Sequence, residues 1–147
     1  MSAVKAFLIE PLAGTIRPVT INRESSYVDI KAHLKCDMID IVRLECGHDI
    51  IVDDNGLEET LPCLTEVTGA PTPLSGNLLF TKSDEMGELV DVTENIETAA
   101  SRFTVVRPVL HPVIGVSERP GVVAVDLMRI EISLDRSAPK VVEAAEA

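Results

Sequence analysis

The chain has 147 residues and a formal net charge of −11. This length suits one globular domain, and the charge argues against direct binding to nucleic-acid phosphates or to an anionic membrane surface. Aromatic residues make up only 3% of the chain, and tryptophan is absent. The core must therefore be built from Val, Ile and Leu, and this composition favours sheet.

Cysteine usage and the absence of long apolar runs predict a cytoplasmic protein. The three cysteines, Cys36, Cys46 and Cys63, are an odd number, which is typical of reduced thiols. The first residues lack the apolar core of a secretory signal. No apolar run approaches the roughly 20 residues that span a bilayer. We therefore expect no membrane association.

Short apolar runs between turn residues predict most of the strands. Before residue 93 the predicted strands are 4–9, 16–21, 38–45, 49–52, 57–61, 77–82 and 88–92. Residues 65–76 contain two prolines and two glycines, so we interpret them as a loop.

Two short helices are predicted between these strands. Tyr27, Ile30 and Leu34 recur at helical spacing, so they predict an apolar stripe on a helix that ends near Cys36. The second helix is predicted to begin with Thr93 as its cap. Its buried stripe is expected to be formed by Ile96, Ala99, Ala100 and Phe103.

The last third of the chain is again β-rich. Pro108 interrupts the predicted strand 104–110, and residues 122–134 form the longest strand candidate. In that candidate apolar and polar residues alternate, which indicates one face towards water. From Asp135 the chain is small, charged and alanine-rich, which predicts a disordered tail over 135–147. The sequence thus predicts one α+β domain over 1–134, with a mostly antiparallel sheet and two short helices.

Negative charge is concentrated in the middle of the chain. The segment Asp37–Glu97 holds fifteen acidic residues and two basic ones, whereas the remainder has nine acidic and eleven basic residues. Two acidic turns stand out within it, and the candidate partner-binding carboxylates are Asp53, Asp54, Glu58, Glu59, Asp84, Glu85 and Glu88. They either solvate the turns of a sheet or form a surface that imitates nucleic-acid phosphates and binds a basic groove.

The same acidic turns, and the cysteines with His48, are candidates for metal sites. An EF-hand requires acidic ligands before its central glycine and a glutamate at its twelfth position. Placing Gly56 at the centre puts Ile51 first and Pro62 twelfth, and placing Gly87 there puts Lys82 first, so this motif is rejected. A zinc site could use Cys36, Cys46, His48 and Cys63, but no Cys-x-x-Cys knuckle is present. We predict neither a metal nor another cofactor.

The order of motifs between Tyr27 and Thr93 resembles one known family. Asp53-Asp54-Asn55-Gly56-Leu57 and Leu61-Pro62 are followed by Gly76-Asn77-Leu78-Leu79-Phe80 and Asp84-Glu85-Met86-Gly87-Glu88. This order is similar to that of DUF3846-type small proteins of bacteriophages and other mobile elements. The resemblance implies that genetic context, but no activity and no functional residues.

No catalytic motif is found in the sequence. Our first hypothesis is therefore a non-enzymatic, acidic accessory protein of phage or mobile-element type that binds a host protein. The first alternative is a nucleic-acid-mimicking inhibitor of a DNA- or RNA-binding protein. The second alternative is a metal-binding protein or an enzyme that uses Cys46 and His48. The expected partner is a protein with a basic face, and the sequence leaves the oligomeric state open.

Overall fold

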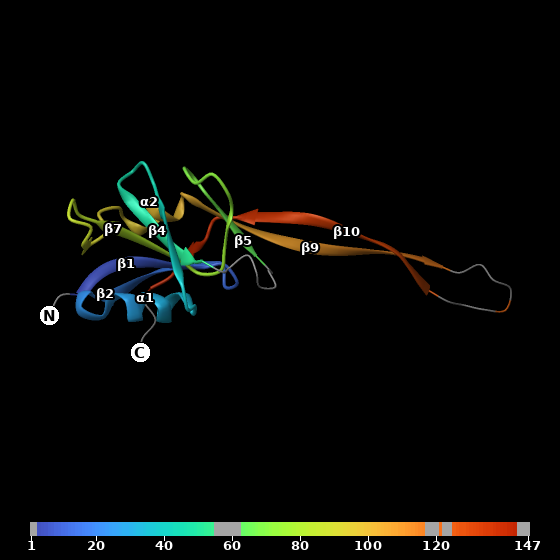
Figure 1. Ribbon diagram of the computed structural model, residues 1–147. Coiled ribbons are helices and arrows are strands. Elements are labelled where there is room, and N and C mark those ends of the chain that lie inside the picture. The colour runs from blue at the N-terminus through green and yellow to red at the C-terminus, as the bar shows by residue number, and fades with distance from the viewer. Residues whose placement is uncertain (1–2, 55–62, 117–120, 122–124, 144–147) are drawn as a thin grey trace.

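A computed structural model describes residues 3–54, 63–116, 121 and 125–143 (Figure 1). Over this part of the chain, strands dominate and two sheets are formed. The predicted strand 57–61 and the candidate residues Glu58 and Glu59 lie outside the described residues.

The larger sheet forms the centre of the molecule. Over the described residues its strands lie in the order β11 (Lys140–Val141), β2 (Thr15–Asn22), β1 (Ala3–Glu10), β7 (Leu78–Ser83), β4 (His48–Asp53) and β3 (Ile39–Arg43), with β8 (Leu89–Val90) also paired to β7. Neighbouring strands are antiparallel, except that β11 runs parallel to β2. The predicted α+β class with an antiparallel-rich sheet is therefore confirmed, although this sheet is mixed.

The second sheet corrects one sequence-based expectation. Its order is β10 (Val125–Ser137), β9 (Phe103–Val116), β5 (Leu64–Val67) and β6 (Leu74–Ser75). Segment 65–76, predicted as a loop, thus contributes two short strands. Proline and glycine signals in this segment mark the turn between β5 and β6, and the flanking residues pair with each other and with β9.

The central sheet is buried on both faces. One face packs against β5, the start of β9 and the helix α2 (Ile96–Ala100), around Phe7, Phe80 and Phe103. Phe7 and Phe80 stack with ring centroids 6.2 Å apart, and Phe103 meets Phe80 edge-on at 5.9 Å. The three phenylalanines of the chain are therefore gathered in one core, where they bury a large apolar area.

The other face of the sheet is covered by the helix α1 (Ser26–Leu34), which follows a 3₁₀ turn, η1 (Arg23–Ser25). Ile30 and Leu34 are buried against β1 and β2, as predicted. Tyr27 was expected to belong to the same stripe but is 52% exposed. It instead holds the Lys31 ammonium 4.5 Å from its ring centroid, a cation–π contact at the surface.

Helix α2 begins later than the sequence predicted. Its N-cap is Asn95, whose side chain accepts a hydrogen bond from the Thr98 backbone N–H, and Thr93 lies outside the helix. Asn is as good a cap as Thr. Ala99 and Ala100 are buried as expected, whereas Phe103 already belongs to β9.

Strand β9 is continuous through Pro108 and Pro112, which corrects the predicted interruption. The Arg102 carbonyl, just before β9, accepts a hydrogen bond from the Thr68 backbone N–H, just after β5. Backbone groups of a strand alternate in direction, so the even-numbered residues of β9 point theirs towards the β5 side and away from β10. The two prolines therefore lie where their missing N–H groups would face the outer edge of the ribbon. Proline is tolerated at such edge positions.

The predicted tail boundary at Leu134 falls inside a strand. β10 continues to Ser137, and Lys140–Val141 then form β11 beside β2. The Val142 N–H donates to the Ile16 carbonyl at 3.0 Å. Residues 140–142 are thus held on the central sheet.

Candidate functional site

The predicted carboxylates lie at two opposite ends of the central sheet. Asp53 ends β4 and Asp54 follows it, whereas Asp84 and Glu85 follow β7. Because β4 and β7 are antiparallel neighbours, with His48 opposite Lys82, the ends of the two strands point in opposite directions. Glu58 and Glu59 lie outside the described part of the chain, so the role of these carboxylates in partner binding stays a prediction.

The turn after β7 is built by its own aspartate. The Asp84 carboxylate accepts hydrogen bonds from the Met86 and Glu88 backbone N–H groups at 2.9 and 3.0 Å. This is the local bonding for which Asp is favoured in turns. Glu85 and Glu88 are exposed on the same turn. One acid thus shapes the turn, and two others are displayed to solvent.

A polar cluster that the sequence only partly indicated lies at the start of β4. Cys46, His48 and Glu94 each place a ligand-type atom within 4.8 Å of the other two. Cys46 and His48 were candidates for metal binding or catalysis, whereas Cys36 and Cys63 do not belong to this group. Glu94 was missed because it is distant in sequence and reaches the cluster only through the pairing of β7 with β4 and β8.

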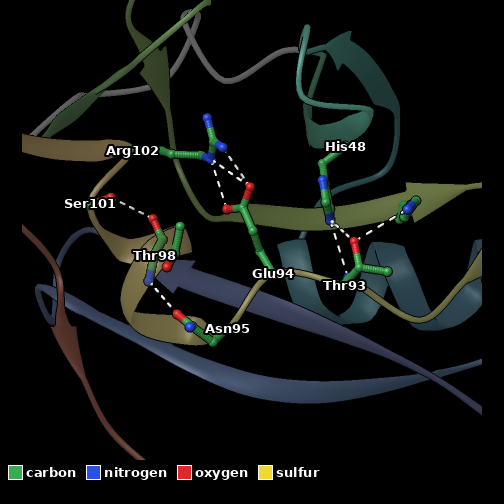
Figure 2. A network of polar contacts seen from close by, with 8 residues as sticks. His48, Thr93, Glu94, Asn95, Thr98, Ser101 and Arg102 are labelled. Atoms are coloured by element: carbon green, nitrogen blue, oxygen red, sulfur yellow. Dashed lines mark hydrogen bonds and ion pairs between the residues drawn. The ribbon is translucent and has the colours of Figure 1, made fainter.

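His48 is engaged in the fold itself. Its ring stacks on Phe80 with centroids 4.7 Å apart, and its Nε2 accepts a hydrogen bond from the Thr93 backbone N–H at 3.3 Å (Figure 2). Burial lowers the pKa of His48, partly opposed by the Glu94 carboxylate, which raises it. The neutral ring is therefore favoured, and its Nε2 lone pair is already used.

Glu94 is engaged by a cation. Arg102 donates to both carboxylate oxygens of Glu94, with contacts of 2.6 and 2.8 Å (Figure 2). This bonding lowers the pKa of Glu94, and it raises the pKa of Arg102. The buried Nδ1 of His48 has no hydrogen-bond partner among the described residues, so it is the ring nitrogen that the Thr93 contact leaves unused. A metal ion that used Cys46, His48 and Glu94 would compete with Arg102 for the Glu94 carboxylate and would lie close to the guanidinium. Because His48 Nε2 already accepts from Thr93, this nitrogen is not free to act as the base that would activate Cys46.

The most prominent surface feature is a long β-ribbon. Residues 105–137, in which β9 pairs with β10 from Val105↔Ser137 outwards, form what we call the arm. The rest of the chain is called the body. Figure 1 shows the arm, drawn in orange and red, projecting well away from the body. Every residue of β10 is exposed.

The two faces of the arm differ sharply. Pairing places ten exposed apolar residues on one side, which we call the apolar face: Pro108, Leu110, Pro112, Ile114, Val116, Val125, Leu127, Ile130, Ile132 and Leu134. The opposite side is mixed: it carries Val109, Val113 and Met128 together with polar residues bonded to each other, since His111 contacts Ser133 at 2.7 Å and Arg129 contacts Glu131 at 3.0 Å. The predicted water-facing side is therefore confirmed over 125–134, but the apolar side of this segment is uncovered as well.

A β-bulge keeps the apolar face continuous. The register shifts between Leu127 and Arg129, so Met128 is an extra residue in β10. If Met128 instead paired with Ile114 in a regular ladder, Leu127 and Val125 would change sides. A Cβ on Gly115 would meet the Met128 side chain at 3.0 Å, so the methionine lies over this glycine on the opposite side. In β10 the sequence signal for this face was the alternation of apolar and polar residues around Ile130 and Ile132. In β9 the same alternation was obscured by the prolines.

The division into body and arm is also seen when the chain is compared with known proteins. The domain of unknown function DUF3846 matches residues 4–104, so the chain belongs to the DUF3846 family. The resemblance stated from the sequence is confirmed. The match ends where the arm begins.

Two relatives are similar over most of this chain. The "Uncharacterized protein y4iR" of Sinorhizobium fredii (strain NBRC 101917 / NGR234) is 29% identical over 108 residues, covering 74% of this chain and 67% of that protein. "Protein PsiB" of Rhizobium leguminosarum bv. phaseoli is 26% identical over 129 residues, covering 85% of this chain and 96% of that protein. No solved structure matches the chain significantly. Among the described helices, none is long and apolar enough to cross a membrane.

Proposed function

We propose that this protein is a non-enzymatic interaction protein whose acidic body binds the basic face of a protein partner. The observation that carries the proposal is the separation of charge between the two parts. Residues 1–104 hold eighteen acidic and eight basic residues, whereas the arm holds four of each. The body therefore attracts a basic surface over distances of about a Debye length, roughly 8–10 Å at physiological salt.

The polar cluster supports an interaction role over an enzymatic one. An enzyme needs a nucleophile or base that is free to react. His48 already accepts from Thr93, and both oxygens of Glu94 are held by Arg102. These contacts tie the segment before α2 to the core, which is a structural task.

The partner that fits this proposal is a protein rather than nucleic acid or membrane. Both of the latter present negative charge and would be repelled by the body. The DUF3846 resemblance implies a phage or mobile-element context, so we propose that the partner is a host protein. A narrower version of this proposal is that the protein occupies a basic groove in which the partner normally binds nucleic acid. Duplex DNA should then compete with the protein for the captured partner.

Capture from host lysate at two salt concentrations tests the proposal. Partner recovery is expected to fall at least several-fold between 0.1 and about 0.5 M salt, because the screening length drops to about 4 Å. The double variant Glu85→Gln/Glu88→Gln should weaken recovery at low salt. Glu131→Gln on the arm is the matched control and should leave it unchanged. Capture that is equal at both salt concentrations would exclude an electrostatic acidic site.

A further inference from the structure

We propose that the apolar face of the arm packs against the same face of a second copy of this chain, so that the protein is a homodimer. The two arms would lie antiparallel and face to face, as two layers of a small sandwich. A contact of this kind uses the same patch on both copies and closes on itself. It concerns the arm and not the carboxylates of the proposed function.

The arm has a physical need for cover. A two-stranded ribbon alone is marginally stable in water, and it gains stability when an apolar face is packed. On this arm the aliphatic residues of the apolar face are between 52% and 72% exposed. No described residue of the body covers them, because the arm projects away from it (Figure 1).

The area is sufficient for a specific contact. An aliphatic side chain presents roughly 100 Å² of apolar surface. Eight such residues at about 60% exposure amount to roughly 500 Å² per copy, which is at the upper end of the largest patch on an ordinary monomer. Two copies would bury about 1,000 Å², the lower bound for a biological interface.

Charge favours a second copy as the occupant. The ten residues of the apolar face are uncharged, the nearest charge on that side being Arg136 at the base of the arm, where it pairs with Glu66, and the whole arm has a net charge of zero. The remainder of the chain carries the full −11 and would repel its own copy. The arm is therefore the surface through which two of these acidic chains can meet without bringing like charges together.

The shape of the molecule agrees with this arrangement. A paired stretch of twelve residues extends about 40 Å at roughly 3.4 Å per residue. Antiparallel packing of two arms would place the acidic bodies at opposite ends. Their separation would then be several Debye lengths, so that their repulsion is largely screened.

The prolines select face packing over strand addition along β9. Pro108 and Pro112 remove two N–H donors from its outer edge, as the register shows. An edge interrupted by two prolines is a poor template for continuing a ladder. Both proline rings lie on the apolar face, where they add to the surface that a second copy would cover.

Sedimentation equilibrium of the purified full chain tests the dimer. We expect twice the monomer mass of 15.9 kDa at micromolar concentration, without any partner present. Ile132→Asp places a charge in the middle of the apolar face and should give a monomer. Ser133→Asp, the next residue on the opposite face, is the matched control and should remain dimeric. A monomeric wild-type chain at 100 µM would overturn the proposal, as would an Ile132→Asp variant that stays dimeric.

Salt should affect dimerisation and partner capture in opposite ways. Dimerisation should hold or tighten as salt rises from 0.1 to 0.5 M, because screening reduces repulsion between the bodies, whereas capture of a basic partner should weaken. Leu110→Asp on β9 repeats the test on the second strand, and far-ultraviolet circular dichroism shows that each variant keeps its folded body. A dimer that dissociates in salt would show that charge pairing, and not the apolar face, joins the copies.

Discussion

The body and the arm are built from the same kinds of residues but use them differently. In β7 of the body, Leu79 is fully buried, whereas Leu110 in β9 of the arm is 61% exposed. Both lie in strands with regular pairing. The comparison teaches that an apolar strand pattern defines which residues share a face. What covers that face depends on elements elsewhere in the chain or in another molecule.

The two parts also differ in how polar groups are satisfied. In the body, charged residues near the core are paired, as with Arg102 and Glu94, whose side chains are 25% and 16% exposed. On the arm, Arg129 and Glu131 pair at 64% and 57% exposure, where a salt bridge adds little. Polar contacts should therefore contribute to stability in the body and far less on the arm.

The largest contrast is expected from matched leucine substitutions. Leu79→Ala removes a side chain from the core between β1 and α1 and should lower the free energy of unfolding by about 2–5 kcal/mol. Leu110→Ala on the arm should change it by less than about 0.5 kcal/mol. Urea denaturation at low protein concentration measures both, and equal effects would show that the arm belongs to the same cooperative core.

A smaller effect is expected at the buried ion pair. Glu94→Gln should cost about 1.5–3 kcal/mol at neutral pH, because Arg102 loses its charged partner. The matched surface variant is Glu131→Gln on the arm, which should cost less than about 0.5 kcal/mol. Thermal and urea unfolding at pH 7 compare the two. Similar costs would contradict the stabilising role of the Arg102 contact.

Acid should reveal the same cluster. Arg102 holds the pKa of Glu94 in the folded protein below its ordinary value of 4.5. The contribution of Glu94 to the free energy of unfolding is therefore complete above pH 4.5 and is lost as the pH falls through the pKa of the folded state. The pKa of His48 is likewise below 6.5 because of burial. Stability should thus decline from pH 7 towards pH 4 and below. In Glu94→Gln the decline below pH 4.5 should be shallower, as unfolding series at each pH would show.

The joint between the two parts should respond to Arg107. Its Nη2 donates to the carbonyls of Pro11 and Leu12, each at 2.8 Å, and so ties the base of the arm to the β1–β2 turn. Arg107→Ala should cost about 1–2 kcal/mol and speed amide exchange in the turn. Arg136→Gln, which removes the more exposed contact with Glu66, serves as the control. Unchanged exchange after Arg107→Ala would mean that the turn is held by other contacts.

The smallest contrast compares two glycines. Gly14 has φ +70°, and a Cβ added to it would lie 3.2 Å from Nη2 of Arg107. Gly14→Ala should therefore lower the free energy of unfolding by about 1 kcal/mol. Gly115 lies in the arm, where a new Cβ would meet only the flexible Met128 side chain. Gly115→Ala should therefore be nearly neutral. Melting temperatures of both variants test this, and a larger loss at Gly115 would show that the bulge is rigidly packed.

Much of the body could be predicted from the sequence, because its signals are local. The runs 4–9 and 16–21 gave the β1–β2 pair, and the Ile30/Leu34 spacing gave α1. The site was less accessible. Cys46 and His48 were noticed, but Glu94 and Arg102 reach them only through strand pairing. The strands inside 65–76 were missed because their partner is the distant β9.

By itself, the sequence determined the α+β class, the acidic middle of the chain and the family, because composition, charge and motif order are properties of the chain alone. Only the tertiary structure decided that β9 passes through two prolines, that β10 stands free in solvent and that ten exposed apolar residues share one side of the arm. The physical reason is that register and covering depend on contacts between residues far apart in the chain. Alternation along a single strand indicates two faces, but it does not indicate what lies against either of them.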